Sequence, residues 1–213
     1  TSFDNIVSPF FGGGSFEFHM QHKYNLKIIA NDKFTPLYNF WSICKSNKDN
    51  LCDELYTKID HIEKPDFYNF REQIINEADN FNQCLMYFII NRCSFSGATL
   101  SGGFSLEASK KRFTQSSIDR IKKLNLTRFE IYNLDFEEFI EQHNDTDNLV
   151  FLDPPYYLEK GSKLYGNNGD MHENFDHNKL YTCLSTKKNW FMTYNNCEYI
   201  KNLYKDFKII DTS

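Results

Sequence analysis

Short apolar runs alternate along the chain with longer stretches in which apolar residues recur at helical spacing. Short runs bounded by polar residues or glycine are typical of buried strands, and recurrence every three or four residues is typical of helices. The runs predict strands at residues 6–11, 26–30, 129–133, 148–153, 189–194 and 208–210, and the intervening patterns predict helices from Ser15 and over 36–44, 136–142, 177–185 and 198–207. This alternation favours an α/β fold with a doubly wound, mainly parallel, Rossmann-like sheet.

The middle of the chain departs from this alternation. Residues 45–91 are polar and mostly helical in pattern, with an apolar stripe that we interpret as core: Phe81, Leu85, Phe88 and Ile89. Residues 93–104 hold two glycine-containing turns between short β-compatible pieces, which predicts a hairpin or an irregular loop. A second polar loop with a mobile middle is expected at 159–174.

Composition narrows the class of protein. The 213 residues, 40% of them hydrophobic, suffice for one sizeable domain with a smaller insertion. No apolar run reaches the roughly 18 residues of a membrane helix, and the N-terminus lacks a signal-peptide pattern. The chain begins and ends close to predicted strands, so we expect it to be cut at both ends. The six cysteines form no C-x-x-C pair, so free thiols and no metal are expected.

Charge alone leaves nucleic-acid binding open. A formal net charge of -5 argues mildly against a protein that simply coats nucleic acid. Residues 108–123 nevertheless carry six basic side chains against one acidic one. This segment is compatible with a basic groove and equally with a solvated helix face.

The clearest chemical signal is Asp153-Pro154-Pro155-Tyr156, which directly follows an apolar run. Proline fixes its own backbone angle and restricts the preceding residue, so this corner is stiff. It offers a carboxylate and a proline carbonyl as acceptors, with an aromatic ring beside them. Such an arrangement can hold a flat heterocycle by its amino group, which suggests chemistry on the exocyclic amine of a nucleobase. The alternative is a strand followed by a plain proline turn.

A second constellation predicts a bound adenosine. Gly12-Gly13-Gly14 follows the first predicted strand, where glycine lets the backbone approach a ligand closely. Asp32 ends the second strand, where an acid binds ribose hydroxyls in nucleoside-binding sheets, although an isolated Asp there can equally be a helix cap. Asp135 could accept from an adenine amino group, and Phe136 could pack on the ring. The loop matches neither a P-loop nor a clean dinucleotide fingerprint, so S-adenosylmethionine fits better than ATP or NAD.

These residues together resemble the Dam-like family of DNA adenine-N6 methyltransferases, the α group of amino-methyltransferases. The resemblance covers nearly the whole chain in the expected order. It rests on five segments: Pro9-Phe10-Phe11-Gly12-Gly13-Gly14-Ser15, Asn31-Asp32, Asn91-Arg92-Cys93-Ser94-Phe95-Ser96-Gly97, Asp153-Pro154-Pro155-Tyr156 and Tyr194-Asn195.

The resemblance implies a class I methyltransferase that acts on duplex DNA as a monomer inside bacteria or virus-infected cells, within a restriction–modification system. Residues 1–44 and 113–213 would form the catalytic domain, and 45–112 an inserted target-recognition region. S-adenosylmethionine would become S-adenosylhomocysteine, as Asp153 and Pro154 hold a flipped-out adenine and Tyr156 stacks on it. The implied cofactor residues are Pro9, Phe10, Phe11, Gly12, Gly13, Gly14, Ser15, Asp32, Lys33, Asp135, Phe136 and Asp153. The implied DNA contacts are Arg92, Ser94, Ser96, Thr99, Ser101, Lys110, Lys111, Arg112 and Tyr157.

Departures from the family pattern keep other interpretations open. The N-terminal Gly-Gly-Lys segment and the later Glu-containing strand are absent, and Ala98-Thr99-Leu100 replaces the frequent Leu-Tyr-Arg. The alternatives are a methyltransferase acting on RNA adenine or on cytosine N4, an inactive fragment that only binds nucleic acid, and a nucleotide-binding oxidoreductase. Asp at the start of the corner favours adenine over cytosine, and the missing dinucleotide fingerprint argues against the oxidoreductase.

Overall fold

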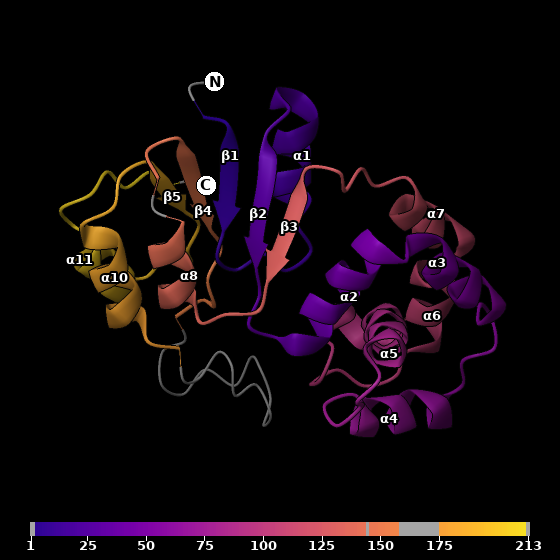
Figure 1. The fold of residues 1–213 in the computed structure, drawn as a ribbon. Helices are drawn as coiled ribbons and strands as arrows, with labels where there is room; N and C mark the ends of the chain where they lie inside the picture. Colours follow the sequence, from indigo (N-terminus) through magenta and orange to yellow (C-terminus); the bar gives the residue numbers. More distant parts are fainter. Residues whose placement is uncertain (1–2, 144, 158–174, 212–213) are drawn as a thin grey trace. The chain divides into compact units, whose positions relative to one another are not determined.

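Five parallel strands form one sheet in the order β3-β2-β1-β4-β5 (Figure 1). The computed structural model describes residues 3–143, 145–157 and 175–211. The strands are β1 (Asn5–Ser8), β2 (Lys27–Asn31), β3 (Phe129–Tyr132), β4 (Asn148–Leu152) and β5 (Trp190–Met192). β1 pairs with β2 and β4, and β4 pairs with β5. The α/β fold with a Rossmann-like parallel sheet is thus confirmed.

The central strands are apolar because they are covered on both faces. Ile6 and Val7 of β1 and Ile28 and Ala30 of β2 are completely buried. Near-continuous apolar runs of this kind are typical of parallel strands buried between helix layers. β1 lies between β2 on one side and β4 on the other, so the chain winds in opposite directions from this point. Ligands of open α/β sheets bind beyond the carboxyl ends of the strands at such a reversal.

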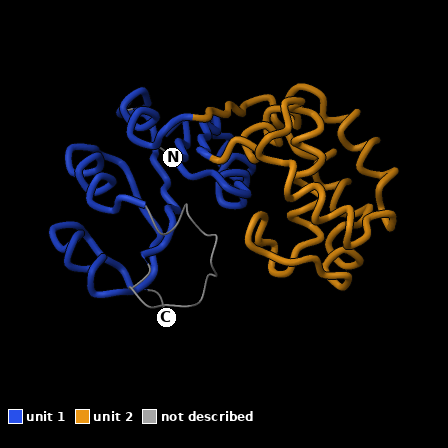
Figure 2. The backbone as a smooth tube through the Cα atoms, turned by 90° about the horizontal axis from the view of Figure 1, so that it is seen from below, with its two compact units in different colours: residues 1–33, 134–213 blue, residues 34–133 orange. Residues whose placement is uncertain are grey.

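The chain divides into two compact units, coloured separately in Figure 2. Unit 1 comprises residues 1–33 and 134–213, and unit 2 comprises residues 34–133. The predicted boundaries at 44/45 and 112/113 differ from these. Unit 2 therefore also contains the helix that follows β2 and the segment that includes β3. A target-recognition role for residues 45–112 stays a prediction.

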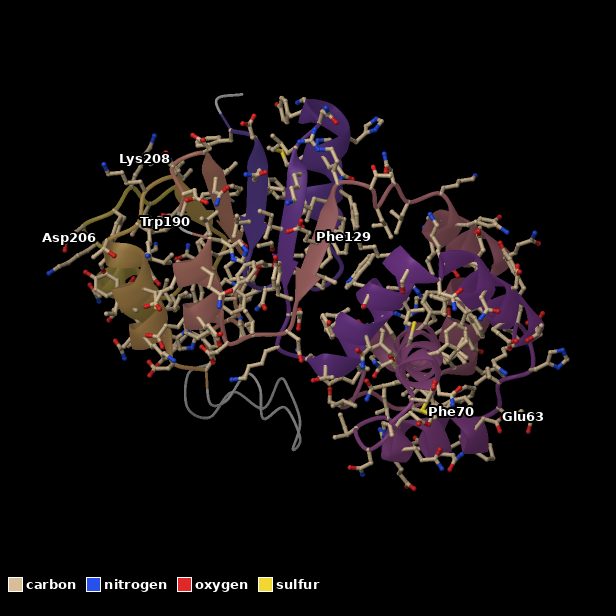
Figure 3. All side chains as sticks on the ribbon, in the orientation of Figure 1. Glu63, Phe70, Phe129, Trp190, Asp206 and Lys208 are labelled. Atoms are coloured by element: carbon tan, nitrogen blue, oxygen red, sulfur yellow. The ribbon has the colours of Figure 1, made fainter. Side chains whose placement is uncertain are left out.

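Unit 1 contains four described helices beside its strands: α1 (Ser15–Tyr24), α8 (Phe136–Gln142), α10 (His177–Ser185) and α11 (Glu198–Leu203). Phe16 of α1 packs on Phe151 with ring centroids 4.3 Å apart. Trp190 of β5, labelled in Figure 3, packs on Tyr204 and Phe207, which follow α11 in the chain. Aromatic contacts therefore fasten helices to the sheet, as the 21 Phe and 13 Tyr of the chain suggest.

Unit 2 is mostly helical, and α5 packs against α2, α4 and α6 within it. Its helices are α2 (Thr35–Ser46), α3 (Lys48–Thr57), α4 (Lys64–Gln73), α5 (Asn80–Cys93), the 3₁₀ turn η1 (Phe95–Gly97), α6 (Leu106–Arg112) and α7 (Gln115–Lys122). Leu85, Phe88 and Ile89 are buried, so these members of the predicted stripe are core, whereas Phe81 is only half-buried. Phe88 stacks on Phe40 of α2 at 5.9 Å between ring centroids.

Several further sequence expectations can be compared with the structure. The helix predicted from Ser15 does begin at that residue, and its N-cap is Gly14, which has a left-handed backbone. Residues 208–210 form no strand in the part of the chain that is described, where Ile210 is 71% exposed. Of the two forms predicted for residues 93–104, a hairpin or an irregular loop, the structure has the irregular loop, closed by one antiparallel bridge between Ser94 and Phe104. The loop expected at 159–174 lies outside the described residues.

Candidate active site

The Asp153–Tyr156 corner directly follows β4. Leu152 and Pro154 are buried, whereas Asp153 is exposed and Tyr156 is 43% exposed. The strand end is therefore anchored in the core, and the acidic and aromatic side chains face outward. The pKa of the Tyr156 hydroxyl is raised by burial and by the neighbouring Asp153 carboxylate. The two side chains predicted to act on the substrate thus lie next to each other.

Three consecutive residues after β5 fasten this corner. The Thr193 hydroxyl donates to the Asp153 carboxylate at 2.7 Å. The Tyr194 ring lies 6.1 Å from the Tyr156 ring, centroid to centroid, and the two rings are tilted by 31°. The Asn195 side chain makes two hydrogen bonds to the backbone of Tyr157, accepting from its N–H at 3.2 Å and donating to its carbonyl at 3.0 Å. Carboxylate, ring and backbone of the corner are each held by the neighbouring loop.

The glycine turn follows β1, the strand beside β4. Gly12 and Gly14 have φ values of 52° and 66°, which favour glycine. A Cβ on Gly14 would also come within 2.3 Å of the Phe11 ring. The Gly12 N–H donates to the Asp32 carboxylate at 3.0 Å, so the acid at the end of β2 is bound to the turn. Gly13 is exposed, with nothing within 4 Å of a Cβ placed on it.

Asn31 joins the loops that follow the neighbouring strands. Its amide donates to the carbonyl of Pro9 at 3.1 Å and to that of Leu134 at 3.1 Å. Its side-chain oxygen accepts from the Leu134 N–H at 2.8 Å. Asn31 is buried, so these bonds satisfy a polar group that would otherwise be costly there. This side chain sets the spacing between the glycine turn and the loop that carries Asp135.

Asp135 is the N-cap of α8 and lies in a cluster of charges. Its carboxylate accepts from the Glu137 N–H at 3.2 Å and contacts Lys33 at 2.9 Å and Lys179 at 3.5 Å. The hydrogen bond from Lys33 and the positive charge of both lysines hold its pKa below the usual value, against the effect of burial. Lys33 thus contacts a predicted cofactor residue directly.

Phenylalanine rings gather beside Asp135. The Phe136 ring lies 5.6 Å from that of Phe10 and 5.4 Å from that of Phe175, and Phe10 and Phe175 are 5.5 Å apart. Phe11 differs from Phe10, since its ring is buried against Gly14 and Phe18. Phe10 and Phe136 therefore belong to one apolar cluster beside Asp135, whereas Phe11 packs against the glycine turn itself.

Glu17 of α1 is a titratable group that the sequence pattern did not single out. It is 2% exposed, and its carboxylate accepts from the Ser8 hydroxyl at 2.5 Å. Burial raises its pKa to about 7, the Ser8 hydrogen bond opposes this, and the Asp153 charge adds to it. A buried acid therefore lies near enough to Asp153 to feel its charge.

The predicted DNA contacts lie in unit 2, apart from Tyr157. Ser96, Ser101, Lys110 and Lys111 are exposed, and Thr99 is half-buried. Lys111 pairs with Glu107 at 2.7 Å on the same helix. These side chains remain candidates for contacting nucleic acid.

The four other predicted contacts have structural partners or are buried. Ser94 is completely buried, and its hydroxyl donates to the Asn91 carbonyl. This burial argues against the predicted contact between Ser94 and DNA. Arg112 donates to the Ser94 carbonyl and thereby holds the loop. Arg92 lies over the Phe88 ring, and burial and the charges of Arg120 and Arg112 lower its pKa. Tyr157 stacks on Tyr199 at 4.2 Å and lies in an aromatic cluster.

Three further observations concern the described residues as a whole. Among the described residues, no helix is both long and apolar enough to span a membrane. The same residues contain no cluster of three or more His, Cys, Asp or Glu side chains arranged to bind a metal ion. All six cysteines are unpaired.

Comparison with known proteins agrees with this arrangement. The family model described as D12 class N6 adenine-specific DNA methyltransferase matches residues 2–213. The chain is also similar to the type II methyltransferase M.CviBI of Paramecium bursaria Chlorella virus NC1A, with 23% identity over 215 aligned residues. That alignment covers 95% of this chain and 77% of the viral protein.

Proposed function

The chain belongs to the D12 class of N6 adenine-specific DNA methyltransferases, and we propose that it transfers the methyl group of S-adenosylmethionine to a flipped-out adenine at a specific site in duplex DNA. DNA adenine methylation follows from the family. The cofactor, the site residues and the sequence specificity are our proposals. Family membership favours this function over the RNA, cytosine, oxidoreductase and purely binding alternatives.

One observation carries the assignment of the site. The glycine turn follows β1 and the Asp153–Tyr156 corner follows β4, and these strands are paired with Val7 opposite Val150. Phe10 lies three residues after Val7, and Asp153 lies three residues after Val150. Because the two strands are parallel, both loops leave the sheet at the same edge. A cofactor held at one loop and an amine held at the other would meet there.

Asp153 and Pro154 would hold the amine. The nitrogen of an aromatic amine is a poor nucleophile because its lone pair is delocalised into the ring. If the Asp153 carboxylate and the Pro154 carbonyl each accept one N–H, the lone pair is directed toward the methyl group. Thr193 keeps the carboxylate oriented through its 2.7 Å hydrogen bond. This positioning is how the corner would lower the barrier.

Tyr156 would bind the extruded base. Its ring is 43% exposed, so one face can stack on adenine. Base stacking on an aromatic side chain contributes about 1–3 kcal/mol per base, which offsets part of the cost of leaving the duplex. The Tyr194 ring, 6.1 Å away between centroids, would help to orient this surface.

The glycine turn fits the proposed cofactor. Bound S-adenosylmethionine would supply an electrophilic methyl group on a sulfonium. The exposed Gly13 allows close backbone approach, and Gly12 keeps the Asp32 carboxylate beside the turn, where it would accept ribose hydroxyls. Asp135 would accept from the adenine amino group, while Phe10 and Phe136 would pack on the ring. The remaining predicted residues, Pro9, Phe11, Gly14, Ser15 and Lys33, would shape the turn or orient Asp135.

DNA binding and biological setting complete the proposal. Arg92, Ser96, Thr99, Ser101, Lys110, Lys111, Arg112 and Tyr157 remain the proposed DNA contacts, with the lysines on phosphates. The relative named as a type II methyltransferase suggests a restriction–modification role. We further propose that the protein acts as a monomer, without a metal ion, in the cell compartment that holds its DNA.

Asp153→Ala tests the proposed mechanism. The variant should bind S-adenosylmethionine like the wild type in calorimetry and lose methyl transfer to duplex DNA, measured with tritium-labelled cofactor. The target site would first be mapped as methyladenine after expression of the gene in a methylation-free host. Asp206→Ala, the same change at an exposed residue, is the matched control. Wild-type turnover by Asp153→Ala would eliminate this mechanism.

A further inference from the structure

His177, the first residue of α10, lies in a cluster of aromatic rings behind the Asp153–Tyr156 corner. It is 9% exposed. Its ring lies 5.0 Å from that of Phe175, 5.3 Å from that of Tyr157 and 5.7 Å from that of Tyr194. Neither the sequence pattern nor the proposed chemistry gives this histidine a task.

A hydrogen bond links His177 to the corner. Nδ1 of His177 shares a hydrogen bond with the hydroxyl of Tyr194. The other end of the Tyr194 side chain lies against Tyr156, with the two rings 6.1 Å apart. Burial lowers the pKa of His177, so the imidazole is neutral near neutral pH and keeps this bond.

The contact matters because the other constraints on Tyr156 act on its hydroxyl, which is hydrogen-bonded to Asp153 and Thr193, and not on the faces of its ring. Thr193 holds the carboxylate of Asp153, and Asn195 holds the backbone of Tyr157. Tyr156 is 43% exposed. A half-exposed ring supported on one face takes its orientation from that face, and here the supporting ring is Tyr194.

We propose that His177 is a positioning residue for base capture: its hydrogen bond fixes the tilt of Tyr194, and Tyr194 fixes the tilt of the Tyr156 surface that receives the extruded adenine. The inference rests on the proposed stacking role of Tyr156. His177 touches neither substrate nor cofactor in this scheme. It acts on the reaction only through its hydrogen bond to Tyr194 and the contact between the Tyr194 and Tyr156 rings.

A double-mutant cycle tests the link. His177→Phe keeps an aromatic ring but removes Nδ1, and Tyr194→Phe removes the hydroxyl. Each should lower kcat about tenfold, as expected when a buried polar group is left unpaired near the reacting centre. Since both changes break the same bond, the double variant should lose no more than either single one. His177→Asn, whose amide lies near the position of Nδ1, should recover part of the rate.

Two readouts separate positioning from general stability. Each single variant leaves one buried polar group unpaired and should lose a few degrees of Tm, whereas the double variant leaves none and should recover most of that loss while its kcat stays low. The affinity for S-adenosylmethionine should stay at the wild-type value in all three variants. The fluorescence change of a duplex with 2-aminopurine at the target position should become smaller, because the captured base is held less well. Tyr204→Phe is the matched control, since it removes a buried hydroxyl from another aromatic cluster of unit 1, and it should change neither kcat nor this signal.

The outcomes are distinguishable. Unchanged kcat in both single variants, additive losses in the double variant, or losses that follow the Tm or the cofactor affinity would each overturn the inference. If His177→Phe fails to fold, Tyr194→Phe carries the same prediction. Tyr156→Ala is measured in parallel: wild-type turnover there would refute the stacking role itself. Loss of turnover there, with His177→Phe and Tyr194→Phe unaffected, would refute only the role of His177.

Discussion

The buried acid Glu17 makes the stability of the protein depend on pH in a specific way. Its pKa rises from an ordinary 4.5 to about 7, mainly because burial disfavours the charged form. In the native protein Glu17 therefore keeps its proton up to about pH 7, whereas in the unfolded chain it loses the proton near pH 4.5. Between these values the native state binds more protons than the unfolded state.

The sign and size follow from linkage. Where the native state binds more protons, the free energy of unfolding falls as pH rises. Each unit of pKa difference corresponds to about 1.36 kcal/mol, so ionisation of Glu17 costs the native state about 3 kcal/mol once the pH is above 7. Below pH 4.5 the acid is protonated in both states, and this contribution disappears.

Glu17→Gln isolates the effect. The glutamine carbonyl can still accept from Ser8, but it cannot ionise. Near pH 4.5 the variant should match the wild type, and by pH 8 it should be more stable by about 3 kcal/mol. The assay is guanidinium unfolding over this pH range, with Glu141→Gln as an exposed control. The difference between variant and wild type cancels all other titrations, so a difference that stays constant with pH would refute the reasoning.

Two further predictions concern buried and exposed polar groups. The Tyr204 hydroxyl is buried and has no hydrogen-bond partner among the described residues, so Tyr204→Phe should raise the free energy of unfolding by about 1 kcal/mol, and a destabilised variant would point to a partner for this hydroxyl. The double variant Lys110→Ala/Lys111→Ala should reduce the salt slope of DNA binding by about two at unchanged Tm, and an unchanged slope would refute the phosphate contacts. Arg112→Ala should instead lower the Tm, because Arg112 donates to the Ser94 carbonyl.

The parts of the site that the sequence predicts are those that follow strands. Asp32 and Asp153 directly follow β2 and β4, Asp135 comes three residues after β3, and parallel strands bring their carboxyl ends to one edge. The glycine turn can be predicted from the sequence because Gly12 and Gly14 need φ values that other residues rarely adopt. Both signals are local in the sequence, so no knowledge of tertiary contacts is required to find them.

Other parts of the site depend on contacts between distant segments. Ser8 and Glu17 look like ordinary strand and helix residues until packing buries the pair. In the sequence, Arg112 is one of three adjacent basic residues. In the structure, its guanidinium donates to the carbonyl of Ser94, 18 residues away, whereas Lys110 is exposed. These roles depend on the direction in which each side chain points, and the pattern of charges along the sequence does not specify that direction.

The Asp153–Tyr156 corner is constrained twice, by its own covalent structure and by its neighbouring strand. Two prolines limit the backbone of the corner, but they do not orient the Asp153 carboxylate or the Tyr156 ring. β4 and β5 are paired with Leu152 opposite Met192, so the next residues along, Asp153 and Thr193, meet at the strand ends. A shift of one residue in this pairing would turn Thr193 to the other face of the sheet and release the carboxylate. The registry of a short edge strand therefore sets the geometry of the proposed chemistry, and this explains why the motif alone does not specify an active site.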